Sequence, residues 1–417
     1  MKVRIGRVGS AGRISAAMVA LCAVSPSWAQ WAQWGGPRQD FVANSTGLST
    51  KWPADGPKKL WKRDIGEGYS AILVDGGRLY TMHRVDGKEA VLALDPKTGE
   101  TVWEYRYDSS PRDGHVHDFG DGPRGTPLVV GDSLYAIGVA GVMHCLDKNT
   151  GRVLWQHDLW TEFGGNVLNH GYSSSPIAYK GTVIALVGGP GASLVAFDQK
   201  TGDVAWKALD FANSYSTPKL IKIGGKDQLV IFMASQIIGV DPADGSLKWE
   251  HSCENQWKQN VCMPIWDEKE RILFYSSNDV GAFGLKLTPK GDKTDVKELW
   301  STKKIQLYHV TSVRIGDYVY GSTGAMAPAF FSAINMKTGE VAWRKRGFSK
   351  ATCVLADGKL IILDEDGKLG IATPTPKDLQ VHSETTLLDK VAWTVPTVVG
   401  KTLYVRDKKS IVAVDLG

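Results

Sequence analysis

Polar, cationic and aromatic residues recur shortly before each of eight short strand-like segments, where a ring-shaped fold would bring them together. Arg124 offers a planar guanidinium and Lys350 a point charge, which suit a carboxylate or another anion. His170 and His309 could orient such a ligand or transfer protons. We predict a site for a protein or for a small anionic or carbohydrate ligand, or else a set of side chains that only fills a channel. The set consists of Tyr69, Arg124, His170, Tyr172, Tyr215, Asn260, His309, Lys350 and Trp393.

The long segment 108–124 carries a second group of residues with possible chemistry. His115, His117 and Asp118 stand close together in it, and Asp121 follows. Imidazole and carboxylate groups are ligands of zinc and other transition metals. The pattern predicts a metal site at His115, His117 and Asp118, with a solvated polar loop as the alternative. The segment 155–170 is also long, and it could form a lid or a partner surface beside the same site.

The cysteines indicate one possible disulfide. Four of the five cysteines lie beyond residue 29, and an exported protein meets an oxidising compartment. Cys253 and Cys262 are close in sequence and could close a small loop, so we predict a disulfide between them. Cys145 and Cys353 fall in apolar strand-like segments and are expected to be buried thiols.

An internal repeat predicts the elements that position these residues. An apolar strand ends at Asp95, Gly99 follows four residues later, and Trp103 stands eight residues after the aspartate. The carboxylate can accept bonds from turn amides, glycine supplies the positive φ of the hairpin, and tryptophan fills the gap between twisted sheets. We therefore assign the repeated tryptophans to packing between blades. They are Trp61, Trp103, Trp155, Trp206, Trp249, Trp300 and Trp343.

The number of repeats predicts an all-β, eight-bladed propeller over residues 59–417, preceded by an extension over 30–58. Eight segments rich in Ser, Thr and Pro mark the innermost strands of the blades. Trp61 lies in a strand that no hairpin precedes, and the chain ends in a strand, 411–417, that no tryptophan strand follows. The N-terminal strand should therefore complete the last blade and close the ring without a free edge.

The first 29 residues read as a secretory signal peptide. Four basic residues precede an apolar stretch, 14–24, and Ala29 offers a small residue for cleavage before Gln30. Leu21 is too bulky for a lipoprotein cleavage site at Cys22, so we expect a periplasmic or secreted protein without a lipid anchor. Removing the four basic residues leaves 45 basic against 44 acidic side chains, a net +1. This balance predicts no nucleic-acid partner, and we expect a monomer without a transmembrane segment.

The Asp-x-x-Thr-Gly-x-x-x-Trp spacing at Asp95–Trp103 resembles the pyrroloquinoline-quinone (PQQ) repeat. That repeat occurs in quinoprotein alcohol dehydrogenases and in the propeller subunit of the outer-membrane β-barrel assembly machinery. The resemblance covers residues 59–417, and the run Trp31–Arg38 also resembles the start of exported bacterial proteins of this type. The resemblance implies a propeller of the quinoprotein dehydrogenase type.

Two functions follow from the resemblance. Quinoprotein dehydrogenases share a disulfide between adjacent cysteines that stacks on the quinone, and a Ca²⁺ held by Glu, Asn and Asp. This sequence has no adjacent cysteines, and no motif in it places the calcium ligands. The assembly factors are typically lipid-anchored, unlike the protein expected here. We predict a binding or scaffold module of the periplasm or cell envelope, with no assigned catalytic residue. The alternative is a PQQ- and calcium-dependent oxidoreductase acting on an alcohol or sugar.

Overall fold

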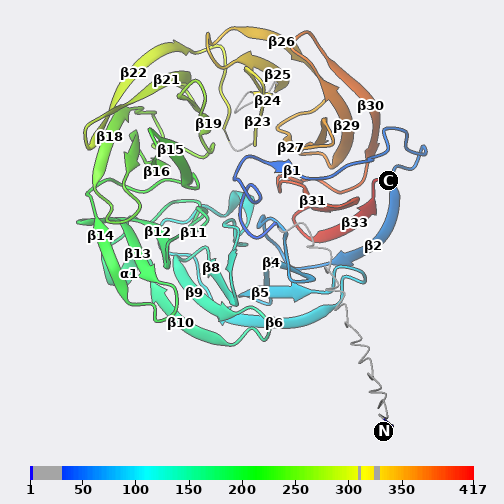
Figure 1. The fold of residues 1–417 in the computed structure, drawn as a ribbon, viewed down its shortest axis with the longest axis horizontal. Helices are drawn as coiled ribbons and strands as arrows, with labels where there is room; N and C mark the ends of the chain where they lie inside the picture. The colour runs from blue at the N-terminus through cyan, green and yellow to red at the C-terminus, as the bar shows by residue number, and fades with distance from the viewer. Residues whose placement is uncertain (3–30, 309–310, 324–328) are drawn as a thin grey trace.

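The computed structural model describes residues 1–2, 31–308, 311–323 and 329–417, and these form a ring of β-sheets (Figure 1). The strands of the described residues make eight sheets, one per blade, arranged around a central channel. The predicted eight-bladed propeller is confirmed. The predicted signal peptide, apart from its first two residues, and His309 lie outside the described residues.

Each blade contains four antiparallel strands that follow one another from the channel outward, except where the N-terminal segment contributes a strand. The strands of blades one to four are β3 (Leu73–Asp75), β4 (Arg78–Val85), β5 (Lys88–Leu94) and β6 (Thr101–Asp108); β7 (Leu128–Val130), β8 (Ser133–Ile137), β9 (Val142–Asp147) and β10 (Val153–Asp158); β11 (Ile177–Tyr179), β12 (Thr182–Gly189), β13 (Ala192–Asp198) and β14 (Val204–Ala208); β15 (Lys219–Ile223), β16 (Lys226–Phe232), β17 (Gln236–Val240) and β18 (Leu247–Ser252).

Blades five to eight continue this order. Their strands are β19 (Ile265–Asp267), β20 (Ile272–Ser277), β21 (Gly281–Lys290) and β22 (Lys293–Thr302); β23 (Val313–Ile315), β24 (Tyr318–Thr323), β25 (Phe330–Asn335) and β26 (Val341–Lys345); β27 (Thr352–Ala356), β28 (Lys359–Leu363), β29 (Lys368–Pro374) and β30 (Leu379–Thr386), joined by β1 (Val42–Ala43); β31 (Thr397–Val399), β32 (Thr402–Arg406) and β33 (Ser410–Asp415), joined by β2 (Lys58–Asp64). The loops contain the short helices η1 (His117–Phe119) and α1 (Leu159–Phe163), and no helix of the described residues could span a bilayer.

The aspartate, glycine and tryptophan of the repeat make the turn and packing contacts that their spacing predicts. Asp95 Oδ1 accepts bonds from the amides of Lys97 at 2.8 Å and Thr98 at 3.0 Å, and Gly99 has φ +74°. The indole of Trp103 donates to the carbonyl of Lys148 in the next blade at 2.9 Å. Four further repeat tryptophans make the same kind of bond to the next blade: Trp61, Trp155, Trp300 and Trp343.

Two repeat tryptophans pack differently. Trp206 lies against Gly245 of the next blade, where a Cβ would come within 2.7 Å of its ring. Trp249 instead donates to Gln228 Oε1 of its own blade at 2.9 Å, and its ring covers Gly239. The repeat spacing thus fixes the position of each tryptophan, while the neighbouring side chains decide its partner.

The N-terminal strand closes the ring as predicted. β2 pairs antiparallel with β33, so that Trp61 stands opposite Ala413 and Lys59 opposite Val414. β2 is thereby the outermost strand of the last blade, beside the first blade in Figure 1. Since the first and last parts of the chain share one sheet, no blade is left half-built.

An N-terminal segment that precedes β2 crosses the channel, and the sequence did not predict this feature. Figure 1 shows this N-terminal segment, in blue, at the centre of the ring. Residues 31–43, which we call the plug, accept bonds from one innermost-strand amide in each of four blades. β1 also pairs in parallel with β27, and Trp31 and Phe41 are buried. The donor and acceptor pairs are Val74 to Trp31, Val129 to Ala32, Leu220 to Gln39 and Leu355 to Phe41.

The plug lies at the far end of the channel from the predicted ligand site. The donors Val74, Val129, Leu220 and Leu355 each follow a residue of the predicted site by five positions. Five residues of extended chain span about 16 Å. The channel therefore has a plugged end and an opposite end, the mouth, where the loops before the innermost strands converge.

The structure contradicts the predicted disulfide. Cys253 and Cys262 are free, buried thiols. Cys253 packs with Tyr275 and Leu273 between blades four and five, whereas Cys262 packs with Phe274 between blades five and six. The two side chains thus lie on opposite faces of blade five, which short sequence spacing cannot show. Burial raises the pKa of both thiols to about 12.

Candidate functional site

Five of the predicted site residues meet at the mouth. The rings of Tyr69 and Trp393 stack at 5.8 Å, and the guanidinium of Arg124 lies over Tyr69 at 5.8 Å. His170 lies 6.1 Å from Tyr215, whose hydroxyl accepts a bond from the His170 amide at 3.3 Å. These residues come from the loops before blades one, two, three, four and eight, so the ring closure brings them together.

Three other predicted site residues are engaged in contacts within the fold. Asn260 is buried, and its amide donates to the carbonyl of Met233 at 2.7 Å. Tyr172 is buried in the core between blades two and three. Lys350 Nζ forms an ion pair with Glu365 at 3.2 Å, so its charge is already balanced. The point charge that we expected Lys350 to offer an anion is thus paired with Glu365.

Arg124 keeps unused hydrogen-bonding capacity. Its guanidinium is partly buried and donates to the carbonyls of Gly120 at 2.8 Å and Gly122 at 3.3 Å. Among the described residues no carboxylate forms an ion pair with it. Burial lowers the pKa of Arg124, and burial likewise lowers the pKa of His170, which leaves that imidazole neutral near pH 7. Arg124 thus forms no ion pair among the described residues, although Asp121 and Glu67 lie near enough to act on its charge, and its remaining donors favour an anionic group.

Phe119 contacts this group, and no repeat position or motif predicts it. Its ring contacts His170 at 5.6 Å and Trp393 at 5.4 Å, and its carbonyl accepts a bond from the Tyr69 hydroxyl at 2.7 Å. His170 and Trp393 belong to loops of different blades, so Phe119 bridges across the mouth. A flat ligand that stacked on His170 or Trp393 would meet this ring.

Three long loops around the mouth are joined at Asn169. Its carbonyl accepts a bond from the Val116 amide at 2.6 Å, and its Oδ1 accepts from Tyr215 at 2.5 Å and from Gln259 at 3.3 Å. The loops 109–125, 159–173 and 253–262 therefore form one rim. Each presents an exposed apolar side chain: Phe119 is 43% exposed, Val167 45% and Trp257 59%.

The predicted metal ligands are close together, with one replacement. His115, His117 and Asp121 place one ligand atom each within 4.8 Å of the others. His117 Nδ1 lies 2.6 Å from Asp121 Oδ1, and His115 Nε2 lies 3.2 Å from it. The chain turns through η1 and Gly120, at φ +81°, which brings Asp121 back over His117. Asp121 therefore takes the place that we assigned to Asp118.

Arg406 connects the last blade to the first blade near the mouth. It is fully buried at the end of β32 in the last blade, and its guanidinium donates to the carbonyls of Gly68 at 2.8 Å, Ser70 at 3.2 Å and Met82 at 2.9 Å in the first blade. Burial lowers the pKa of Arg406 to about 10. The bonds fasten the loop that carries Tyr69 to the blade that closes the ring.

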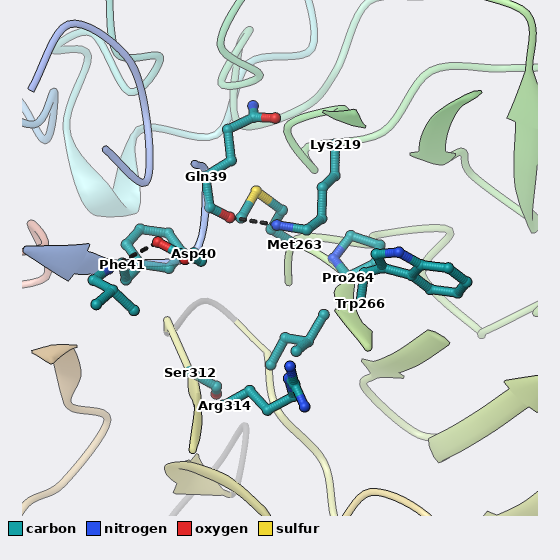
Figure 2. Close-up of a pocket in the computed structure, with 11 residues that line it drawn as sticks. Gln39, Asp40, Phe41, Lys219, Met263, Pro264, Trp266, Ser312 and Arg314 are labelled. Carbon is teal, nitrogen blue, oxygen red and sulfur yellow. Dashed lines mark hydrogen bonds between the residues drawn. The ribbon is translucent and has the colours of Figure 1, made fainter. Parts of the chain in front are cut away.

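A cavity of about 120 Å³ lies at the plugged end (Figure 2). Gln39 and Phe41 of the plug, Lys219 and Arg314 contribute to its walls. Lys219 is buried, and its ammonium donates to the carbonyl of Gln39 at 2.5 Å. Burial lowers the pKa of Lys219 to about 8. The sequence signal was a lysine directly after Pro218, where the Pro127 and Pro176 repeats have Leu and Ile.

Comparisons with known proteins point to two groups of relatives. The sequence model of a family described as outer membrane protein assembly factor BamB matches residues 36–117 and 87–345. The chain is 21% identical over 279 residues to BamB of Yersinia pestis, which covers 63% of this chain and 67% of the relative. It is 26% identical over 174 residues, 41% of this chain, to the dehydrogenase subunit of a quinone-type alcohol dehydrogenase of Gluconobacter oxydans (strain 621H). The chain covers only 20% of that subunit.

A solved structure shows the same fold. The quinohemoprotein alcohol dehydrogenase ADHIIG from Pseudomonas putida HK5 superposes with a TM-score of 0.64, over 93% of this chain and 80% of that one. The sequence identity is 13%, so this likeness concerns the fold alone.

Proposed function

The chain belongs to the PQQ-repeat propeller family, and from this premise we propose that it is a binding and scaffold module of the bacterial cell envelope that holds a protein partner at the rim of its mouth. The observation that carries the proposal is the rim itself. Three loops joined at Asn169 each present an exposed apolar side chain, Phe119, Val167 and Trp257. Aromatic side chains that are held in place before binding often contribute most of the energy of a protein interface.

The other exposed apolar side chains of the described residues are distributed differently. Apart from Met1, they occur singly on the outermost strands of six blades, and such isolated residues are normal for a soluble surface. They are Leu60, Val102, Leu154, Val204, Leu299 and Val381. Within the described part of the chain, only the rim carries exposed apolar groups on neighbouring, mutually bonded loops, and it is therefore the region best suited to a partner.

The relatives suggest the process that the partner serves. Several relatives are named outer membrane protein assembly factors, and we propose a role in that process. It requires an envelope location, which agrees with the predicted signal peptide over residues 1–29. Edman sequencing of the mature protein should start at Gln30 if the predicted cleavage occurs.

Site-specific photo-crosslinking tests the proposal. A benzoylphenylalanine at position 119, in the native bacterium, should give one discrete crosslinked protein. The same group at position 102, which is similarly exposed on β6, should not. Phe119→Ala should lower the amount of folded outer-membrane β-barrel protein, while Val102→Ala should leave it unchanged. Equal crosslinking at both positions would contradict a specific rim.

A quinone-dependent oxidoreductase remains the second candidate because of Arg124. PQQ carries three carboxylates, and Arg124 has donors that no carboxylate of the described residues uses. Calorimetric titration with PQQ and Ca²⁺, followed by a dye-coupled assay over alcohols and sugars, separates the two candidates. Binding that is lost in Arg124→Ala, together with dye reduction, would establish the enzyme. We expect no dye reduction, because Phe119 fills the space over the mouth.

A further inference from the structure

The cluster at the rim has the composition and spacing of a mononuclear metal site. Two imidazoles and one carboxylate converge, and Asp121 Oδ1 lies 3.2 Å from His115 Nε2 and 2.6 Å from His117 Nδ1. Ligand atoms bound tetrahedrally to zinc at 2.0–2.1 Å stand about 3.3 Å apart. Small rotations of the exposed His117 side chain would bring all three atoms to that spacing.

His115 provides independent support, because one nitrogen of its buried ring, Nε2, has no hydrogen-bond partner among the described residues. Its side chain is 3% exposed. The nearby Asp121 oxygen is within ion-pair distance but is not oriented for a hydrogen bond. A buried imidazole nitrogen without a partner costs free energy, and a metal ion between the two groups would satisfy both.

The surrounding contacts hold the three residues in place. The amide of Val116, between the two histidines, donates to the Asn169 carbonyl at 2.6 Å. Arg124 donates to the carbonyls of Gly120 and Gly122, on either side of Asp121. The ligands are thus fixed by neighbours outside the cluster.

We propose that His115, His117 and Asp121 bind one divalent transition-metal ion of the zinc class at the rim. Three protein ligands leave at least one coordination position for water or for a group of the partner. Arg124 acts as a positioning residue, since it holds the backbone on both sides of Asp121. The metal site does not require the proposed partner contacts. Because Phe119 lies in the same loop as the metal ligands, the bound ion would also restrict the motion of that loop.

Calorimetric titration of the chelator-treated mature chain with Zn²⁺ tests the site. We expect one ion per chain, a rise in the melting temperature, and a visible absorption band of the tetrahedral type with Co²⁺. Asp121→Asn and His117→Ala should each weaken binding at least about 100-fold, because loss of even a supporting residue costs 10- to 100-fold. His117 is 67% exposed, so its replacement should not disturb folding.

Asp118→Asn is the matched control. It removes a neighbouring carboxylate of the same loop that lies outside the cluster, and it should leave the affinity for Zn²⁺ unchanged. Failure to bind one equivalent of Zn²⁺ in the folded protein would overturn the proposal. So would equal weakening in Asp118→Asn and Asp121→Asn, since that pattern indicates diffuse binding by exposed carboxylates.

Discussion

The mouth and the plugged end of the channel differ in the parts of the chain that build them. Loops from many blades converge at the mouth, where aromatic side chains pack on one another, such as Tyr69 on Trp393 and Phe119 on His170. The plugged end is closed by one segment that bonds to main-chain amides, as Trp31 does with Val74. Side-chain contacts can change without loss of the fold, whereas the plug is part of it. This difference supports the proposal that the partner binds at the mouth.

Each end also contains one buried cation, and the two have unequal surroundings. Arg406 reaches three carbonyls of the first blade, at Gly68, Ser70 and Met82. The ammonium of Lys219 has a single hydrogen bond in the described structure, to Gln39 of the plug. Arginine distributes its charge over several donors, while lysine depends on one compact group. We therefore expect Arg406 to stabilise the fold and Lys219 to weaken it at neutral pH.

The largest effect should come from removing the N-terminal strand. A chain that begins at residue 65 lacks β2, so that β33 is left as an open edge with exposed amides and carbonyls. We expect loss of the cooperative melting transition and aggregation in light scattering. A chain that begins at Lys58 lacks the plug but keeps β2, and it should stay monomeric with a lower melting temperature. Wild-type melting of the shorter chain would refute the role of β2.

Replacement of Arg406 should have the next largest effect. Arg406→Ala leaves the carbonyls of Gly68, Ser70 and Met82 without their donor and creates a cavity, which should cost about 4 kcal/mol of unfolding free energy. Urea denaturation measures the change. Arg344→Ala, at an exposed position of β26, should cost less than about 0.5 kcal/mol. A loss of similar size in both variants would show that Arg406 is not a brace.

Lys219 should make the unfolding free energy of the protein depend on pH. Its pKa is about 8 in the folded protein against 10.5 ordinarily, so between these values the unfolded chain holds a proton that the folded chain has released. Stability must then rise with pH across that window, by about 3 kcal/mol for the fully buried group. The unfolding free energy of wild type minus that of Lys219→Met should therefore increase from pH 8 to pH 10.5. A flat difference would mean that Lys219 titrates normally.

A substitution at the mouth should have the smallest effect on the unfolding free energy. Phe119→Ala removes a ring that is 43% exposed, so the unfolding free energy should fall by less than about 1 kcal/mol. With the benzoylphenylalanine placed at position 167 of the same rim, Phe119→Ala should lose most of the crosslinking to the partner, because Phe119 would no longer bridge His170 and Trp393. A stability loss as large as that of Arg406→Ala would mean that Phe119 is part of the fold and would weaken the contrast between the ends.

The candidate site could be predicted only in part from the sequence. Tyr69, Arg124, His170, Tyr215 and Trp393 were found because each occupies the same place in a repeat, and the ring then brings those places together. Lys350 occupies such a place too, but Glu365 neutralises it. Phe119 and Asp121 lie in a long loop outside the repeat. Their positions depend on a local turn and on contacts with another loop, and neither leaves a periodic signal.

The sequence by itself determined the blade count and the closure of the ring. The blade count rests on bonds at a fixed spacing, such as those of Asp95 with its own turn amides. The closure follows from the repeat itself, which leaves the strand of Trp61 and the strand of Ala413 each as part of an incomplete blade. Only the tertiary structure decided what closes the channel, that two nearby thiols are kept apart and which carboxylate joins the two histidines. Cys253 and Cys262 are near in sequence but lie on opposite faces of one sheet. Regular spacing encodes repeated local bonds, whereas a single contact between distant segments depends on the fold that brings them together.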